Sequence, residues 1–287
     1  MRPFRGRYPG ITDMLTHRRV WVLAGPIILS NLSVPLVGAI DTAVVGHLPE
    51  ADAIGAVALG AMIFSFLYWG FGFLRMSTTG FIARADGAGD DVELGDIFGR
   101  TLLMAGVFGL LVILVGWPFI HWVLLLIDST ENVEHLTVSY AQIRLWSAPA
   151  VLGMYVISGA LIGLQNTRVA FLLQLLLNLT NMALDILFVS FLGFGVEGVA
   201  YASLIAEYVA FVAGLWVLSG RLRSMARLWD WQRLLDRQAI RGLFSNNANI
   251  FIRTLSLLLV FSYFTSQGAL QGEVILAANA ILMHFFN

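Results

Sequence analysis

The sequence predicts an all-α protein, a polytopic bundle of transmembrane helices, from its composition and from the length of its apolar stretches. Of its 287 residues, 58% are hydrophobic and only 12% are charged, whereas soluble domains carry about 25% charged residues. A helix that crosses a bilayer needs about 20 mostly apolar residues, and stretches of this length follow one another along the chain. The lipid bilayer is therefore the expected environment.

Eight spans can be assigned by searching for long stretches that contain few or no Asp, Glu and Arg residues. Four spans contain none of these residues, and they cover 20–40, 53–74, 101–127 and 145–167. The fifth and sixth, 169–192 and 198–220, are each interrupted by one acid, Asp185 and Glu207 respectively. The seventh, 242–272, is broken only by Arg253, and an eighth begins near residue 274.

Composition and charge also exclude several kinds of function. The 17 basic residues are all Arg and are balanced by 18 acidic residues, for a net charge of -1. Nucleic acid is not an expected partner, because neutralising phosphates needs a clear basic excess. The chain has no cysteine, which excludes a disulfide framework, a cysteine metal site and a thiol nucleophile. We expect no organic cofactor and no enzymatic activity.

The distribution of arginine predicts the orientation of the chain in the membrane. Fifteen of the 17 lie in the amino-terminal arm, in the second and fourth loops, or in the loop after the sixth span. Loops rich in Arg stay on the cytoplasmic side, so we expect a cytoplasmic amino terminus and, for a bacterial protein, location in the inner membrane. Arg144, near the outer end of the fourth span, and Arg253 are exceptions to this pattern.

The chain is expected to contain one complete lobe and the start of a second. Residues 1–220 form the six-helix lobe with its amino-terminal arm, 221–241 alternate Arg with Leu and Trp as in an interfacial amphipathic linker, and 242–287 begin the second lobe. A shift of 221 residues places Ile54, Met62 and Phe64 over Ile275, Met283 and Phe285, as in transporters built from parallel repeats. A complete second copy would need about 155 further residues.

Two acidic residues within the spans are the leading candidates for chemistry, because an ionisable group there costs at least about 2.5 kcal/mol on insertion. Measured along the helix axis, Asp41 lies about 33 Å from Arg19, and Asp185 lies about 26 Å from Arg168. Both distances reach the outer half of the bilayer. Ser203 lies about 9 Å from the outer end of the sixth span, so three segments bring polar oxygens to a similar depth.

The fifth span carries a polar stripe. Its members, at positions i, i+4, i+7 and i+11 of one helical face, are Gln174, Asn178, Asn181 and Asp185. Lipid cannot satisfy such a stripe, which must face other helices or a water-filled cavity. Interhelical hydrogen bonds that merely hold the bundle together are the alternative interpretation.

If Asp41 and Asp185 share one partly dry pocket, each carboxylate disfavours the ionised form of the other. The pair then titrates in two coupled steps, which makes a proton-loading site. The same oxygens with Asn181 and Ser203 could equally coordinate Na⁺, and the sequence leaves H⁺ and Na⁺ open. Glu207, near mid-bilayer, is predicted either to support the ion pathway or to be a buried neutral acid.

Two prolines and two glycines are expected to affect the geometry of the helices rather than to take part in ion binding. Pro26 and Pro35 in the first span each remove a backbone donor and invite a kink, so they are possible hinges or simply tolerated prolines. Gly159 and Gly163 form a GxxxG pattern in the fourth span, which predicts close approach of a neighbouring helix.

Four stretches of the sequence are distinctive when taken together: AGPIILSNLSVPLVGAIDTAVVGHL (24–48), FLRMSTTGFIARADGAGD (73–90), GLQNTR (163–168) and GVEGVAYASLIAEY (195–208). They resemble the multidrug and toxin extrusion (MATE) transporters, in particular their DinF-like branch. The resemblance covers the chain from about residue 17 to its end. It implies a twelve-helix antiporter of two six-helix lobes, monomeric when full length, which exports amphipathic, often cationic small molecules in exchange for H⁺ or Na⁺.

The resemblance also implies a cation site in the amino-terminal lobe. The family uses an Asp of the first helix, an Asn and an Asp four residues apart on the fifth, and a hydroxyl on the sixth. Asp41, Asn181, Asp185 and Ser203 match these positions, although the hydroxyl is often that of Thr. By the same resemblance, we expect about four and a half helices of the second lobe to be missing from this chain, which would then not complete a cleft between lobes by itself.

Two other functions compete with antiport. A flippase for lipid or polysaccharide precursors has the same superfamily shape, but its cavity should be lined with several cations, and only Arg144 and Arg253 support that function. An intramembrane aspartyl protease would need two Asp residues that share a proton, but neither Asp41 nor Asp185 has the glycine-rich surroundings that such proteases have.

Overall fold

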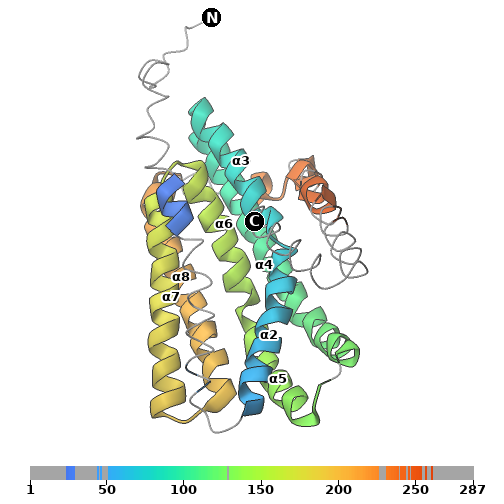
Figure 1. Ribbon diagram of the computed structural model, residues 1–287. Coiled ribbons are helices and arrows are strands. Elements are labelled where there is room, and N and C mark those ends of the chain that lie inside the picture. Colours follow the sequence, from blue (N-terminus) through green and yellow to red (C-terminus); the bar gives the residue numbers. More distant parts are fainter. Residues whose placement is uncertain are drawn as a thin grey trace, which may run out of the picture. The chain divides into compact units, whose positions relative to one another are not determined.

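Helices account for nearly all of the chain that the structure describes (Figure 1). The structure is a computed structural model, and it describes residues 24–29, 44, 46, 51–127, 129–225, 231–238, 240–243, 245, 247–253, 256 and 260. These residues contain helices and short connections, with no strand among them. The predicted all-α class is therefore confirmed.

In the described part of the chain, bounds are defined for seven α-helices of 14 residues or more and for three shorter segments. In chain order they are α2 (Ala51–Trp69), α3 (Phe73–Ala88), α4 (Asp91–Leu126), α5 (Glu131–Arg144), the 3₁₀ turn η2 (Leu145–Ser147), α6 (Ala148–Gly163), α7 (Thr167–Asp185), the π-helical segment η3 (Ile186–Phe191), α8 (Gly195–Met225) and α9 (Trp231–Leu234). Residues 24–29, which include the half-buried Pro26, are helical as well.

Five helical segments in the described part of the chain are long and apolar enough to cross a membrane. They are Asp52–Ala88, Asp91–Leu126, Glu131–Gly163, Thr167–Phe191 and Gly195–Gly220. They correspond to the second to sixth predicted spans, so the polytopic membrane bundle is confirmed. Most of the first span, the end of the seventh and all of the eighth lie outside the described residues.

The helices run beyond the apolar stretches that identified them, because capping residues rather than charges set their ends. The Asp90 carboxylate accepts a hydrogen bond from the Glu93 backbone N–H at 2.9 Å, which starts α4 ten residues before its apolar stretch. Thr130 caps α5 in the same way through the backbone N–H of Val133, at 3.4 Å. Gly89, with φ of 68°, ends α3 in the left-handed conformation that glycine tolerates.

Two spans are interrupted within the bundle. The span Glu131–Gly163 changes from α5 through the 3₁₀ turn η2 to α6, with Pro149 in the first turn of α6. The span Thr167–Phe191 changes from α7 to the π-helical segment η3 immediately after Asp185. Single-turn π segments are rare and occur often at functional sites. The π-helical segment next to Asp185 therefore supports Asp185 as a candidate site residue.

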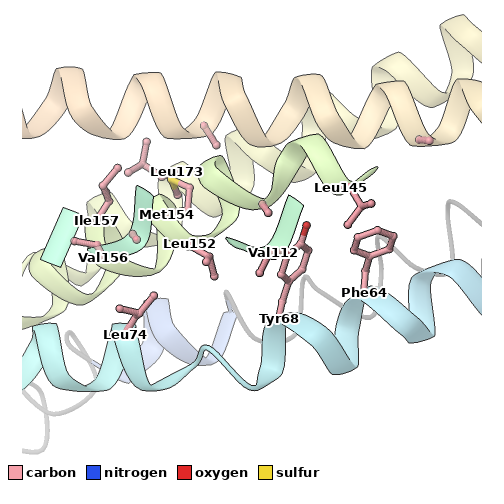
Figure 2. Close-up of a cluster of buried hydrophobic side chains, with 14 of the residues drawn as sticks. Phe64, Tyr68, Leu74, Val112, Leu145, Leu152, Met154, Val156, Ile157 and Leu173 are labelled. Carbon is pink, nitrogen blue, oxygen red and sulfur yellow. The ribbon is translucent and has the colours of Figure 1, made fainter. Parts of the chain in front are cut away.

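A continuous apolar core joins α2 to α8. Its members include Phe64, Leu74, Ile120, Leu152 and Val199, each no more than 1% exposed. Figure 2 shows part of it, with Phe64 and Tyr68 projecting from α2. Large apolar side chains elsewhere, such as those on the outward face of α4, are exposed and suit contact with lipid.

Helices α3 and α6 pack very closely at the predicted GxxxG pattern. A Cβ atom added to Gly159 would lie 2.6 Å from the Arg75 carbonyl oxygen, and one added to Gly163 would lie 2.8 Å from the Thr79 carbonyl oxygen. The Thr79 hydroxyl also donates a hydrogen bond to the Gly159 carbonyl, at 3.1 Å. The predicted close helix approach is confirmed.

The chain divides into two compact units, residues 1–236 and 237–287. All the helices named above belong to the first unit. The described part of the second unit is helical over most of 237–253. The predicted boundaries of the lobe, the linker and the second lobe at 220 and 241 stay a prediction.

Candidate functional site

The polar stripe of α7 faces the interior of the bundle. Asn178, Asn181 and Asp185 are 8%, 2% and 0% exposed, whereas Leu172 and Leu179 on the same helix are half exposed. The stripe continues to the half-buried Gln174, whose amide nitrogen donates a hydrogen bond to the Asn178 side-chain oxygen at 3.0 Å. These polar groups therefore lie among other helices rather than in lipid.

The stripe reaches the neighbouring helix α8 at one of the predicted site residues. The Asn181 amide nitrogen donates a hydrogen bond to the Ser203 hydroxyl at 3.2 Å. Asp185 lies one helical turn beyond Asn181, at the junction between α7 and the π-helical segment η3. The structure thus places Asn181, Asp185 and Ser203 along one helix pair, with the carboxylate fully buried.

Other predicted residues lie outside the part of the chain that the structure describes. These are Asp41 and Pro35, so the predicted meeting of Asp41 with Asp185 stays a prediction. In the described part, no three or more His, Asp or Glu side chains form a group that could hold a metal ion. The choice between H⁺ and Na⁺ at Asp185, and the part that Asp41 takes in binding either ion, stay predictions.

The structure pairs Glu207 with Arg144, a contact that sequence reasoning missed. The Glu207 carboxylate oxygen Oε1 lies 2.8 Å from Nη1 of Arg144, and the two side chains are only 12% and 11% exposed. The prediction that Arg144 lies near the outer end of its span is wrong, because the span begins at Glu131 and Arg144 falls at its central break. Glu207 therefore has a partner in Arg144, and its predicted role in the ion pathway stays a prediction.

Neutral groups from two further segments surround this ion pair. The Ser147 hydroxyl donates to the Arg144 carbonyl oxygen at 2.7 Å, and the Tyr68 hydroxyl lies 2.9 Å from the Ser147 hydroxyl. The guanidinium carbon of Arg144 lies 5.5 Å from the centre of the Phe64 ring, within the range of a cation–π contact. The resulting cluster of Tyr68, Arg144, Ser147 and Glu207 joins α2, α5, η2 and α8.

This cluster lies near the middle of the spans that carry it, which corresponds to the middle of the membrane. Arg144 ends the 14-residue helix α5, about 20 Å along its axis from Glu131. Glu207 lies about 18 Å along α8 from Gly195. The hydrocarbon core of a bilayer is about 30 Å thick, so both charges lie deep in the apolar layer, where each requires a partner.

Arg100 is a second buried arginine that the sequence assigned to a loop. It lies within α4, is 7% exposed, and its Nη2 is 3.4 Å from the Asp96 carboxylate. Its Nε and Nη2 atoms also donate to the Arg233 carbonyl oxygen, at 3.3 and 2.8 Å. Arg100 therefore attaches the short helix α9 to the first turns of α4.

The fold and the buried polar site define a multi-pass membrane protein with an ionisable centre in its helical lobe. Comparison with known proteins gives its family. Residues 26–187 match the sequence model of the MatE family, and since this is more than half of the chain, the chain belongs to that family. The predicted resemblance to MATE proteins is confirmed.

A curated relative supports the DinF-like assignment. Over 268 residues the chain is 38% identical to DNA damage-inducible protein F of Escherichia coli strain K12, an alignment that covers 93% of this chain and 58% of that protein. The chain thus spans little more than half the length of this relative.

Solved transporter structures share the fold. The chain superposes with a TM-score of 0.76 and 22% identity on a MOP superfamily transporter from Pyrococcus furiosus, covering 93% of this chain and 59% of that one. With an outward-facing multidrug resistance MATE family transporter the TM-score is 0.77 at 21% identity, over 93% and 59% of the two chains. The family is one of transporters, which confirms that the chain is not an enzyme and removes the aspartyl protease alternative.

Proposed function

We propose that the chain belongs to a secondary active antiporter that exports amphipathic or cationic small molecules in exchange for H⁺ or Na⁺. The observation that carries this proposal is the fully buried Asp185, which lies one helical turn from the hydrogen bond between Asn181 and Ser203. Membership of the MatE family and the fold shared with a multidrug resistance transporter support it. The small molecule and the lipid bilayer are the expected partners.

The coupling ion acts by changing the charge of a buried carboxylate. A bound H⁺ or Na⁺ neutralises Asp185, which lowers the cost of keeping it in a dry environment. A conformation that closes the site is then favoured with the ion bound, and one that opens the site to water is favoured without it. Different ion affinities in the two conformations are the requirement for coupling. One proton moving down 100 mV supplies about 2.3 kcal/mol, or roughly a fifty-fold gradient of a neutral substrate.

The expected location is the bacterial inner membrane, with the amino terminus in the cytoplasm. The connections that follow α3, α6 and α8 then lie on the cytoplasmic side, since arginines such as Arg84, Arg168 and Arg237 cluster near them. The connections between α4 and α5 and between η3 and α8 lie outside. A reporter fused to the amino terminus that is active only in the cytoplasm tests this orientation.

Efflux by the protein expressed from its complete reading frame tests the proposal. Cells that lack their own pumps are loaded with a fluorescent lipophilic cation, and Asp185→Asn is compared with the wild type. We expect Asp185→Asn to abolish energised efflux, whereas the matched control Asp91→Asn, an exposed acid of α4, keeps it. Efflux by Asp185→Asn at the wild-type rate would show that this carboxylate is not the coupling site.

The choice between H⁺ and Na⁺ needs a separate measurement. In vesicles, a pH gradient without Na⁺ and a Na⁺ gradient at equal pH are imposed in turn. The coupling ion is the one whose gradient alone drives the accumulation of substrate against its own gradient.

The flippase alternative has little support in the described residues. Arg144, one of the two cations on which it depended, is paired with Glu207 at 2.8 Å and so is not available to bind a pyrophosphate. Transport of a labelled lipid pyrophosphate at a rate that Asp185→Asn does not change would favour the flippase over the antiporter.

A further inference from the structure

Burying the Arg144–Glu207 ion pair has a desolvation cost, so a contribution to stability does not by itself explain why the pair is there. Both side chains lie in the membrane-spanning part of the bundle and are about nine-tenths buried. The desolvation of two buried charges often exceeds their mutual attraction, so apolar residues of similar volume are frequently as stabilising or more so. A pair of this kind is best explained by what it holds in place.

The pair fixes a part of α8 that also belongs to the candidate cation site. Ser203 and Glu207 are four residues apart on α8, so their side chains lie one above the other on the same face. Ser203 accepts the hydrogen bond from Asn181 of α7 at 3.2 Å, and Glu207 binds Arg144 of α5 at 2.8 Å. The rotation of α8 about its axis is thus set from two sides, by α7 at one turn and by α5 at the next.

The partner of Glu207 is itself held by the helix break. Arg144 is the last residue of α5, where the chain enters the 3₁₀ turn η2. The Ser147 hydroxyl binds the Arg144 carbonyl oxygen at 2.7 Å and lies 2.9 Å from the Tyr68 hydroxyl of α2. The Phe64 ring lies under the guanidinium group. Two further segments, η2 and α2, therefore restrict the position from which Arg144 reaches α8.

We propose that Arg144 and Glu207 are a positioning pair for the cation site, which orients α8 so that the Ser203 hydroxyl keeps its hydrogen bond with Asn181, one helical turn from Asp185. The proposal rests on the coupling role proposed for Asp185. It assigns to Arg144 and Glu207 no contact with the transported ion or substrate. Residues that orient the ligands of an ion typically change its affinity by 10- to 100-fold when they are replaced.

The experiment measures ion binding by the protein expressed from its complete reading frame and reconstituted in lipid nanodiscs. The probes are ²²Na⁺ at fixed pH and, in Na⁺-free buffer, proton uptake after a pH jump. We expect Glu207→Gln and Arg144→Gln each to raise the half-saturating ion concentration tenfold or more. Glu134→Gln, an exposed acid of α5, is the matched control and is expected to bind as the wild type does.

A double variant separates positioning from folding. The substitutions R144M and E207M together remove both charges and keep apolar bulk, so the protein is expected to unfold at the wild-type temperature or above it and still bind the ion tenfold more weakly. Wild-type ion affinity in this double variant, or in both single variants, would overturn the positioning role.

Asp185→Asn in the same assay separates the positioning role of Arg144 and Glu207 from the coupling role of Asp185. If this variant abolishes ion binding while the variants of Arg144 and Glu207 leave it unchanged, only the positioning role is wrong. If Asp185→Asn binds the ion as the wild type does, the proposed coupling site is wrong and the positioning role falls with it.

Discussion

The contact between α3 and α6 allows a quantitative test of the packing, with Gly159→Ala as the perturbation. The added Cβ atom would lie 2.6 Å from the Arg75 carbonyl oxygen and 3.0 Å from the Thr78 Cβ atom. Neither neighbour is the end of a flexible side chain, so the helices must separate by several tenths of an ångström. Overpacking of this kind costs about 1–3 kcal/mol.

The matched control for this substitution lies on the facing helix. Gly80 of α3 is exposed, and a Cβ atom there would meet nothing within 4 Å. Gly80→Ala is therefore expected to be neutral or to stabilise the protein by up to about 1 kcal/mol, from helix propensity alone. Because Gly159→Ala gains the same propensity, the difference between the two variants isolates the steric contribution, about 1–3 kcal/mol.

The assay is thermal unfolding of the two purified variants in the same detergent. For a protein of this size, 1 kcal/mol corresponds to roughly 2–4 °C, so Gly159→Ala is expected to unfold about 2–12 °C below Gly80→Ala. Equal unfolding temperatures would mean that α3 and α6 do not approach each other at Gly159, and the packing argument would be refuted.

Three further predictions concern hydrogen bonds and orientation. Tyr68→Phe removes the hydrogen bond to the serine hydroxyl of η2 and is expected to lower the free energy of unfolding by about 1 kcal/mol, whereas the exposed control Tyr201→Phe should not; equal values would contradict the bond. Arg100→Gln breaks the contacts with the Arg233 carbonyl oxygen, so trypsin should cleave faster after Arg233 than in the control Arg84→Gln, and unchanged cleavage would count against the docking of α9. A reporter at the amino terminus should be active in the cytoplasm only, and activity on the outer side would reverse the predicted orientation.

The second to sixth spans could be predicted because their apolar stretches are long, but their ends could not. A charge-free stretch ends at the first charged residue, whereas a helix ends where its backbone groups are capped. Arg75 and Arg84 therefore lie within α3, and α4 begins at Asp91, ten residues before the apolar stretch that identified it. The same effect placed Arg100 in a loop, although it is buried inside α4.

The candidate site was predictable to the extent that it depends on one helix. The spacing of Asn178, Asn181 and Asp185 reports their shared face directly, and the structure buries all three. The Arg144–Glu207 pair joins two helices and leaves no such pattern. Arg144 precedes a charge-free stretch by one residue, so it was assigned to the end of a span, and only the extension of that span back to Glu131 brings it to the depth of Glu207.

Two sets of polar contacts meet on α8. One lies along α7, where Gln174 binds Asn178 and Asn181 binds Ser203 of α8, and the other joins Glu207 to Arg144 at the helix break. Because Ser203 and Glu207 share one face of α8, a rotation of this helix that breaks one contact also strains the other. Lipid offers no substitute for either partner, so α8 has few stable orientations. A change in the charge of the α7 site would therefore act on the whole of α8, and through it on the break between α5 and α6.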